Sequence, residues 1–398
     1  MLFAHMADCH LGSWSNHPEL KELSLHAFRK AIDICIDEAV DFILIAGDLF
    51  DTSIPSIDIL RDAVGKLKEC ADRGIPVYTI AGSHDFSPTR KTMLSVLEHA
   101  GLIIDVAKYD EIDGRIKLSF TEDKRTGAKI AGIVGRKGGL EKELFENMEC
   151  SHEDGFKIFM FHSAVEEYRP KHLKEMAAIP LSLLPKGMDY YASGHVHNVF
   201  VSEDGKLVFP GALFPTNFQE LEKCNPGFFL VRANGKIATK RMPVKICDVV
   251  LIEIDAENKP IARVTNEIME SIEKEDLEDK IVLLKISGCL ESGRPADIDF
   301  KRIVSRACDK GARSVKKNVS KLTAKEFEEV QIKDNIGIEE MEKDIIKQHL
   351  GQIKVDGNEE ELTTALMNVL KEEKLEEETN ASYENRILTN AKKVVGLL

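Results

Sequence analysis

Five apolar stretches in the first half of the chain end abruptly at residues that can bind a metal ion. Residues 2–7 precede Asp8-Cys9-His10, and residues 43–46 precede Gly47-Asp48. The other three are residues 76–81 before Gly82-Ser83-His84-Asp85, residues 156–161 before His162, and residues 188–192 before Gly194-His195-Val196-His197. Short apolar runs of this kind predict buried strands. Because open α/β sheets bind ligands beyond the carboxyl ends of their strands, we expect these five ends to meet at one site.

Between the strands, apolar residues at helical spacing predict helices over residues 25–39, 57–73 and 92–100. The last two are ended by Gly74 and Gly101, as helices commonly are. After residue 112 the pattern changes to short strand candidates, at residues 116–120, 129–134, 156–161, 207–209 and 227–231. Alternating strands and helices followed by a run of strands predict an α/β fold in which a second sheet packs on the first, with helices outside both.

Residue 245 begins a different unit. Its pattern predicts strands over residues 249–254, 281–286 and 312–319, and helices over residues 262–272 and 299–307. Beyond it, amphipathic stretches at residues 336–349, 360–374 and 387–398 predict a helical tail, whose middle helix carries Leu362, Leu366, Val369 and Leu370 on one face. Helices this short need a surface to pack against. We therefore predict three parts, at residues 1–244, 245–322 and 323–398.

The composition is that of a globular protein. The chain has 398 residues, enough for two or three domains, and 43% of them are hydrophobic. Its eight cysteines include no CxxC pair, which indicates reduced thiols in a cytosolic protein rather than a disulfide framework or a zinc ribbon. The N-terminus lacks the basic start of a signal peptide, and no apolar run is long enough to span a membrane. We expect a soluble, cytoplasmic protein associated with the nucleoid.

The net charge of −14 argues at first against a nucleic-acid partner, since phosphate binding depends on Lys and Arg. The charge is unevenly distributed, however. Residues 321–398 hold eleven basic and eighteen acidic residues, a net of −7, whereas residues 301–321 hold eight basic residues and one acid, Asp309. The basic stretch is either a local DNA-binding face or an ordinary solvated surface.

The residue types at the strand ends are those of a two-metal site. Two cations about 3.5–4 Å apart need a shared anionic ligand, and Asp48 is placed to be that bridge. Asp8 and His10 are two residues apart, so their side chains point to one side, and His195 and His197 repeat this spacing. Carboxylate and imidazole together favour Mn²⁺, Fe²⁺ or Zn²⁺ over Mg²⁺ or Ca²⁺. Taken singly, each residue could be an ordinary polar strand end; the ordered set indicates the site.

The set DCH, GDLFD, GSHD, His162 and GHVH resembles the calcineurin-like metallophosphoesterases, whose signature is DxH, GD, GNH(D/E), H and GHxH. The segments FAHMADCHLG, ILIAGDLFDTSIPS and GIPVYTIAGSHD further resemble the Mre-eleven or SbcD-type nucleases of DNA double-strand-break repair. The resemblance is strongest over residues 1–244. It implies a four-layer αββα sandwich, a small α+β capping domain and a C-terminal helical tail.

The resemblance also implies a role for each motif residue. Asp8, His10 and His197 would bind one Mn²⁺, His162 and His195 the other, and Asp48 would bridge the two Mn²⁺ ions of each chain. Ser83 stands where the family usually has an Asn ligand, so the second site would be weaker or completed by water. His84 would not be a ligand; it would lie beside the scissile phosphate, where it could stabilise the transition state or protonate the leaving 3′ oxygen. Asp51 stands where some relatives carry a His near the DNA.

Partners follow from the same resemblance. The capping domain would position DNA, with phosphate contacts from Arg302, Arg306, Arg313, Lys316 and Lys317. The tail, through Leu362, Leu366, Val369 and Leu370, would dock on the coiled-coil base of a Rad-fifty-type ATPase. Helices of the catalytic domain would form a homodimer, for which Leu60, Met93, Leu94 and Leu97 are candidates. The tail could instead form an intramolecular lid or a self-association surface.

Three functions are compatible with these features. The first is a Mn²⁺-dependent exonuclease and endonuclease of double-strand-break repair, working with the ATPase. The second is a phosphomonoesterase or cyclic-nucleotide phosphodiesterase, which we would expect to lack the capping block and the tail. The third is a non-catalytic scaffold for DNA or the ATPase, and Ser83 is the feature that favours it.

Overall fold

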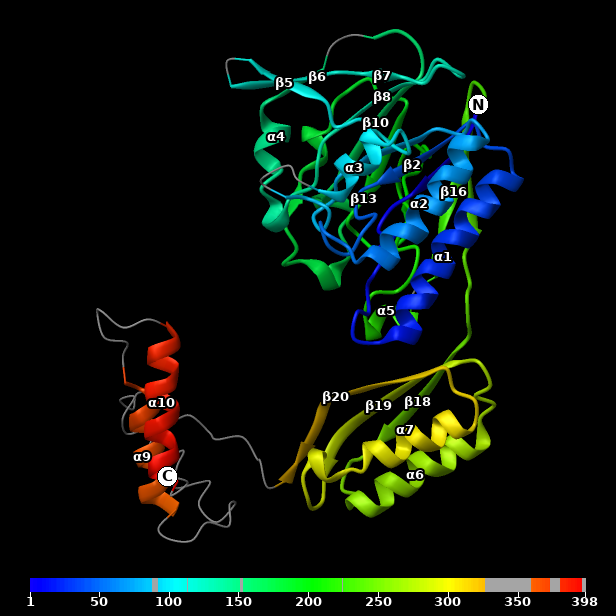
Figure 1. The fold of residues 1–398 in the computed structure, drawn as a ribbon. Helices are drawn as coiled ribbons and strands as arrows, with labels where there is room; N and C mark the ends of the chain where they lie inside the picture. Colours follow the sequence, from blue (N-terminus) through cyan, green and yellow to red (C-terminus); the bar gives the residue numbers. More distant parts are fainter. Residues whose placement is uncertain are drawn as a thin grey trace. The chain divides into compact units, whose positions relative to one another are not determined.

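The computed structural model describes residues 1–87, 92–112, 114–150, 153–223, 225–325, 359–372 and 380–395 (Figure 1). Within these residues, two compact units are distinguished, Met1–Thr323 and Ala324–Leu398. The helices are α1 (Pro18–Asp37), α2 (Ile57–Asp72), α3 (Met93–His99), α4 (Lys142–Glu146), α5 (Phe218–Lys223), α6 (Ile261–Lys274), α7 (Phe300–Asp309), α9 (Glu359–Leu370) and α10 (Asn380–Val394).

The strands fall into two large sheets and three small ones. The first large sheet has the order β17-β16-β1-β2-β3-β4 and the second the order β14-β15-β13-β10-β8-β7. The strands are β1 (Leu2–Met6), β2 (Phe42–Ala46), β3 (Val77–Ile80), β4 (Ile104–Asp105), β5 (Tyr109–Ile112), β6 (Arg115–Leu118), β7 (Thr121–Glu122), β8 (Lys129–Gly132), β9 (Met148–Cys150), β10 (Lys157–His162), β11 (Ala164–Val165), β12 (Ala178–Ile179), β13 (Tyr190–Gly194), β14 (Phe200–Val201), β15 (Leu207–Phe209), β16 (Gly227–Ala233), β17 (Ile237–Pro243), β18 (Val249–Asp255), β19 (Ile281–Leu290) and β20 (Ser314–Ala324).

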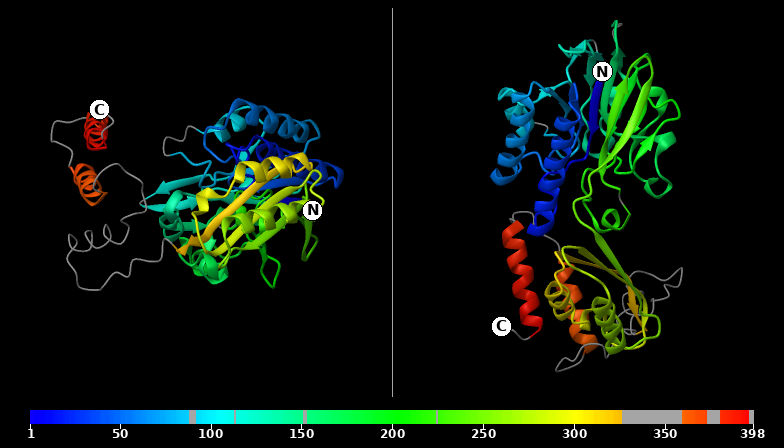
Figure 2. Two further views of the ribbon diagram at one scale, coloured as in Figure 1. Left: turned by 90° about the horizontal axis from the view of Figure 1, so that it is seen from below. Right: turned by 90° about the vertical axis from the view of Figure 1, so that its right-hand side faces the viewer.

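The first sheet is covered by helices on one face. In β1 and β2, alternate residues such as Met6 and Ile45 pack with Phe28 and Ile32 of α1 and Leu67 of α2. Figure 2 (right) shows α1 and α2 in blue on one side of the sheets, with strands of the second sheet in green on the other. Strands β1 to β4 run parallel, so their carboxyl ends lie at one edge.

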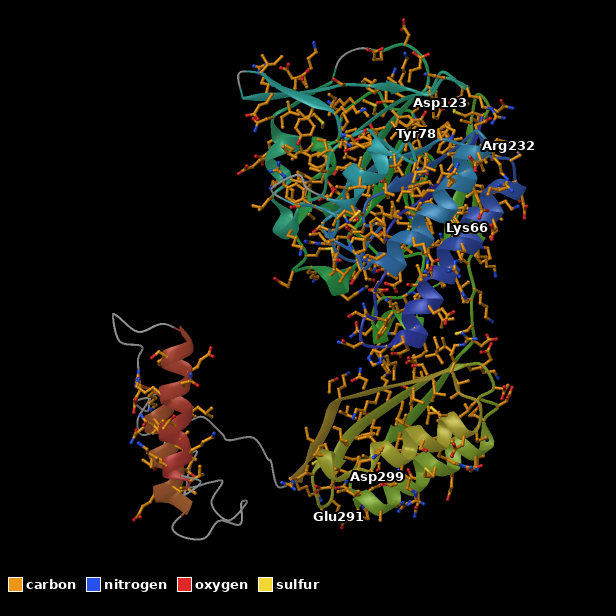
Figure 3. All side chains as sticks on the ribbon, in the orientation of Figure 1. Lys66, Tyr78, Asp123, Arg232, Glu291 and Asp299 are labelled. Carbon is orange, nitrogen blue, oxygen red and sulfur yellow. The ribbon has the colours of Figure 1, made fainter. Side chains whose placement is uncertain are left out.

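The two sheets face each other across a shared apolar core. Phe3, Leu44 and Ile80 of the first sheet pack with Ile158 and Met160 of the second. A polar link joins the sheets at their periphery, where the Tyr78 hydroxyl donates to Asp123 Oδ1 at 2.8 Å (Figure 3). Because β10 is parallel to β13, the carboxyl ends of both strands also lie at one edge.

A fourth layer covers the outer face of the second sheet. Phe159 and Phe161, which alternate with Ile158 and Met160 along β10, pack with Phe145 of the short helix α4. The αββα sandwich expected from the family resemblance is therefore confirmed, with a fourth layer that is thinner than the first.

Most predicted elements occur in the structure, but one helix starts earlier than predicted and several elements were not predicted, among them β5, β9, α4, α5 and β17. Helix α1 starts at Pro18 and not at residue 25, because Leu20 and Leu23 extend its buried stripe by two turns. Strand β17 was not predicted, because its residues mix apolar and polar types and are half-buried or exposed at the edge of the sheet. Among the cysteines whose side chains the structure describes, six are free: Cys9, Cys35, Cys70, Cys247, Cys289 and Cys308.

Residues 249–324 form a three-stranded sheet in the order β18-β19-β20, with α6 and α7 in the connections between strands. Helix α7 begins where predicted because the Asp299 side chain caps it, accepting a hydrogen bond from the Arg302 N–H at 3.0 Å (Figure 3). An ion pair and a hydrogen bond connect this block to the sandwich. Lys285 of β19 pairs with Glu222 of α5 at 3.0 Å, and Ser314 Oγ donates to Glu19 at 2.8 Å.

The unit from Ala324 onward contains α9 and α10, which pack against each other. Helix α9 carries Leu362, Leu366, Val369 and Leu370, and Leu370 is 64% exposed. The helix expected over residues 336–349 lies outside the described residues. The division at residues 1–244, 245–322 and 323–398 stays a prediction.

Candidate metal centre

The five predicted strand ends meet at one site. Asp8 follows β1, Asp48 follows β2, Ser83 and His84 follow β3, His162 ends β10, and His195 follows β13. The loops after β1 and β2 run side by side, with the Asp8 and His10 N–H groups donating to the carbonyls of Gly47 and Asp48 at 3.1 and 3.0 Å. Asp8, His10, Asp48 and His195 all have positive φ angles, between 42° and 79°. Such backbone strain in non-glycine residues is concentrated at functional sites.

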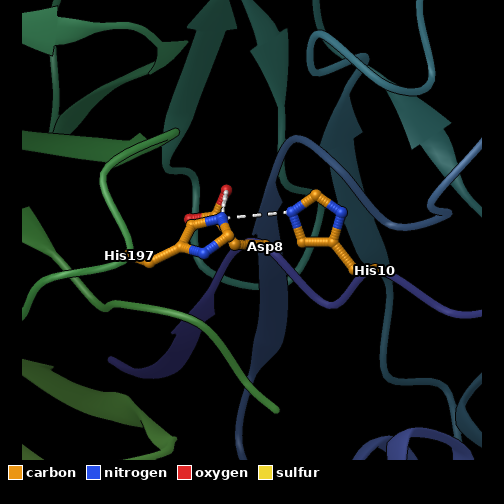
Figure 4. A group of neighbouring side chains, drawn as sticks. All are labelled: Asp8, His10 and His197. Atoms are coloured by element: carbon orange, nitrogen blue, oxygen red, sulfur yellow. Dashed lines mark hydrogen bonds and ion pairs between the residues drawn. The ribbon is translucent and has the colours of Figure 1, made fainter. Parts of the chain in front are cut away.

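Asp8, His10 and His197 form the first group of potential metal ligands (Figure 4). His10 Nε2 lies 3.2 Å from His197 Nε2, and His197 Nε2 lies 3.8 Å from Asp8 Oδ1. The far nitrogen of each ring faces a carboxylate: His10 Nδ1 is 3.2 Å from Asp51 Oδ1, and His197 Nδ1 is 2.8 Å from Glu220 Oε1. A carboxylate only accepts hydrogen bonds, so both Nδ1 atoms carry hydrogen. In neutral rings, two Nε2 lone pairs therefore face each other.

A cation between these lone pairs relieves their repulsion. Burial would lower the pKa of His197, but Glu220 and Asp8 outweigh it and raise that pKa to about 9. Burial would likewise raise the pKa of Glu220, but His197 and Thr216 lower it to about 2. The raised pKa favours a proton at this position, and a divalent ion held by His10 and His197 would replace that proton.

Asp8, Asp48 and His162 form the second group. His162 Nε2 lies 3.1 Å from Asp48 Oδ2 and 3.9 Å from Asp8 Oδ1. Its Nδ1 donates to the Ala46 carbonyl at 2.8 Å, which leaves Nε2 buried without a hydrogen-bond partner. Burial would raise the pKa of Asp48, but His162 and His10 outweigh it and lower that pKa. Burial would lower the pKa of His162, but Asp48 and Asp8 raise it to about 10.

Glycines make this close approach possible. A Cβ at Gly82 would lie 2.2 Å from Asp48 Oδ1, and one at Gly47 would lie 2.3 Å from His162 Nδ1. A Cβ at Gly194 would lie 2.2 Å from the Ala46 carbonyl oxygen. Only a residue without a side chain fits at these three positions, so the glycines of the GD, GSHD and GHVH segments belong to the site.

The remaining motif residues border these groups. Ser83 Oγ donates to Asp48 Oδ2 at 3.4 Å. His84 shares a third ligand group with His10 and Asp48, while its backbone N–H donates to Asp48 Oδ1 at 2.7 Å. The ring centres of His195 and His162 are 5.1 Å apart, and the backbone N–H of His195 donates to Asp8 Oδ1 at 3.0 Å. Burial and the neighbouring His162 lower the pKa of His195 to about 4, which keeps its imidazole neutral and able to bind a metal.

The donor set fits divalent cations. Buried carboxylates, the unpartnered Nε2 of His162 and the facing Nε2 atoms of His10 and His197 are ligands for a metal of intermediate softness. The first group would bind one ion and the second group another. Asp8 belongs to both groups, and Asp48 Oδ2 of the second group lies 3.7 Å from His10 Nε2 of the first.

Comparison with known proteins agrees with this geometry. Residues 1–199, half of the chain, match the calcineurin-like phosphoesterase family. The chain belongs to this family. It is a metal-dependent phosphodiester hydrolase, with the fold that the family resemblance implies and with groups of side chains that could hold metal ions.

Several relatives extend over more of this phosphoesterase. The DNA double-strand break repair protein Mre11 of Sulfolobus acidocaldarius is 28% identical over 72% of this chain and 74% of its own length. The Mre11 protein of Thermoplasma acidophilum is 28% identical over 71% and 76%. An uncharacterized metallophosphoesterase of Bacillus subtilis, YhaO, is 30% identical over 60% and 59%.

Two acidic residues to which the sequence motifs give no role support the site of this phosphoesterase. Glu220 contacts His197 from α5, although the two residues are 23 positions apart and Glu220 lies in no motif. Asp85 was part of the GSHD segment but had no role; it accepts hydrogen bonds from the N–H groups of Leu49 and Phe50 at 3.0 and 2.9 Å. Asp85 thereby fixes the turn that presents Asp48.

The basic residues expected to contact DNA differ in their surroundings. Arg302 is exposed, whereas Arg306 and Arg313 pair with Glu273 and Asp279. Lys317 Nζ lies 4.0 Å from the Phe300 ring centre. Lys316 is only 8% exposed, with Nζ 4.6 Å from the centre of the Trp14 ring. Within the described part of the chain, no helix is long and apolar enough to cross a membrane.

Proposed function

We propose that this phosphoesterase is a Mn²⁺-dependent DNA nuclease of double-strand-break repair, acting as exonuclease and endonuclease at DNA ends with two Mn²⁺ ions per chain. The observation that carries the proposal is the pair of ligand groups, which share Asp8 and in which Asp48 Oδ2 of the second group lies 3.7 Å from His10 Nε2 of the first. The similarity to proteins named for DNA double-strand break repair supports DNA as the substrate. Imidazole and carboxylate ligands together support Mn²⁺.

The bound ions would supply a water-derived nucleophile and neutralise charge that develops on the phosphate. The chain itself would supply a general acid, His84, whose side chain is 42% exposed at the edge of the buried ligands. His84 Nδ1 donates to the Asp51 carbonyl at 2.8 Å, so the proton for the leaving oxygen would be at Nε2.

The proposal includes two protein partners. A Rad-fifty-type ATPase would bind the tail through Leu362, Leu366, Val369 and the exposed Leu370. A second copy of the chain would bind α2 and α3 through Leu60 and Met93. Exposed Ile57 and Val96 support such a contact, whereas Leu94 and Leu97 are buried in the core of their own chain.

Hydrolysis of linear duplex and hairpin DNA by the purified chain with Mn²⁺ tests the function. We expect cleavage that depends on Mn²⁺ and falls about 10²–10⁴-fold in His84→Ala, because that variant lacks the general acid. The His84→Ala variant should still bind Mn²⁺ normally. Turnover of bis-p-nitrophenyl phosphate with DNA left intact, also after addition of the ATPase, would contradict the proposal and indicate a phosphodiesterase of small substrates.

A further inference from the structure

The carboxylate of Glu220 is fixed from several directions. Oε1 accepts hydrogen bonds from His197 Nδ1 at 2.8 Å and Asn217 Nδ2 at 2.6 Å. Oε2 accepts from the Thr216 N–H at 2.8 Å and the Thr216 hydroxyl at 3.1 Å. The side chain is 17% exposed. Four donors on one carboxylate leave it a single orientation, and this orientation determines the direction of the His197 ring.

Helix α5, which carries Glu220, is itself held by the strands of the 249–324 block. Leu221 is buried in the same core cluster as Ile281 and Leu283 of β19. The neighbouring Glu222 pairs with Lys285 of β19 at 3.0 Å, and Lys285 also pairs with Glu253 of β18 at 2.9 Å. Two strands outside the sandwich thus support the helix that orients a metal ligand.

The two ligand groups differ in the charge of the atoms that support their histidines. In the first group, both Nδ1 atoms face carboxylates, those of Asp51 and Glu220. In the second group, His162 Nδ1 faces the neutral Ala46 carbonyl. A carboxylate behind a metal-binding imidazole increases its basicity and fixes its ring, and loss of such a support typically lowers metal affinity 10–100-fold.

We propose that Glu220 is a positioning residue that makes the Asp8, His10 and His197 group the tighter of the two Mn²⁺ sites, and that the 249–324 block supports this arrangement through α5. The proposal rests on the proposed two-metal function, but its test does not measure DNA cleavage. It assigns to the block of β18, β19 and β20 a structural connection to the metal centre.

Mn²⁺ binding to the full chain, measured by calorimetry and by electron paramagnetic resonance of free Mn²⁺, tests this. The wild type should show one tight and one weaker site. Glu220→Ala should weaken the tight site about 10–100-fold, and Glu220→Gln should weaken it less, because the amide oxygen still accepts from His197 Nδ1. Lys285→Ala should weaken it at most about fivefold, as expected for a partly exposed ion pair.

Tyr78→Phe is the control for a general loss of stability. It removes the hydrogen bond from the Tyr78 hydroxyl to Asp123, which takes no part in holding Glu220 or the ligand groups, so Tm should fall while Mn²⁺ affinity stays within about threefold of wild type. Wild-type affinity in a folded Glu220→Ala chain, or two equal sites in the wild type, would overturn this inference alone. A wild-type chain that binds no Mn²⁺ would overturn the proposed function as well.

Discussion

Ser83 Oγ donates to Asp48 Oδ2, the same carboxylate oxygen that lies 3.1 Å from His162 Nε2. The family resemblance implies an asparagine ligand at this position. A hydroxyl is a shorter ligand than a side-chain amide, and here it is directed to the Asp48 carboxylate over 3.4 Å. If the resemblance holds at this position, the second ligand group has one donor fewer than the family signature provides.

Replacing Ser83 with Asn should restore the missing ligand. We expect Ser83→Asn to bind the second Mn²⁺ about tenfold more tightly, which corresponds to about 1.4 kcal/mol, and to leave the first site unchanged. Calorimetric titration with Mn²⁺ measures both. An unchanged or weaker second site would show that Ser83 occupies a position that does not reach the metal.

The glycines at the site should tolerate no side chain. Gly82→Ala would push a Cβ against Asp48, so we expect a loss of about 1–3 kcal/mol in the free energy of unfolding and a large loss of Mn²⁺ binding. Gly65→Ala, in the middle of α2 with no atom within 4 Å of the new Cβ, should stabilise the chain by about 0.5–1 kcal/mol. Urea unfolding compares the two variants, and equal effects would contradict the packing described.

His5 should make stability depend on pH. It is buried between the Tyr190 hydroxyl, 2.9 Å from Nδ1, and the Ser193 carbonyl, 3.1 Å from Nε2. The carbonyl accepts from Nε2–H, so Nδ1 accepts from Tyr190 and the ring is neutral. Burial lowers the pKa of His5 from 6.5 to about 3.

The unfolded chain therefore binds a proton between pH 6.5 and about 3 that the folded chain does not, and stability falls as pH falls through this window. At pH 5 the loss from His5 should be about 2 kcal/mol relative to pH 7. His5→Gln keeps a donor and an acceptor without titrating, so its stability should change less between pH 7 and pH 5. If the free energy of unfolding, measured in urea, falls equally with pH in the wild type and in His5→Gln, this assignment is refuted.

The basic stretch should divide into exposed and structural residues. Arg302→Ala should weaken DNA binding and reduce the slope of log affinity against log salt by about 0.9, the value for one phosphate contact. Lys316→Ala should instead lower Tm, since Lys316 is buried against Trp14. Fluorescence anisotropy at several salt concentrations tests the first variant. An unchanged slope would mean that Arg302 belongs to a solvated face.

The sequence predicted which residues meet at the site because each follows an apolar run, and the topology of parallel strands brings such ends together. Asp8, Asp48 and His162 could be placed side by side without coordinates for this reason, and their role as metal ligands stays a prediction. Glycines 47, 82 and 194 lie in the same motifs. The reason why they must be glycine is a contact with residues distant in sequence, such as that of Gly82 with Asp48, and only the structure shows it.

Other features depend on tertiary contacts that leave no local pattern. Glu220 lies in a six-residue helix within an acidic chain, and its role follows only from the position of His197. Likewise, Lys316 lies in a basic stretch that is typical of a DNA contact, but the Trp14 ring, about 300 residues earlier in the chain, packs against its side chain. Strand β17 pairs at an edge, where burial imposes little apolar alternation.

The central claim is a two-metal centre built on Asp8 and Asp48. Anomalous diffraction at the manganese edge from crystals soaked in Mn²⁺ tests it most directly. We predict two peaks per chain, one between the Nε2 atoms of His10 and His197, and one beside His162 Nε2 and Asp48. A single peak elsewhere, or no peak at these residues in crystals that contain Mn²⁺, would contradict the account.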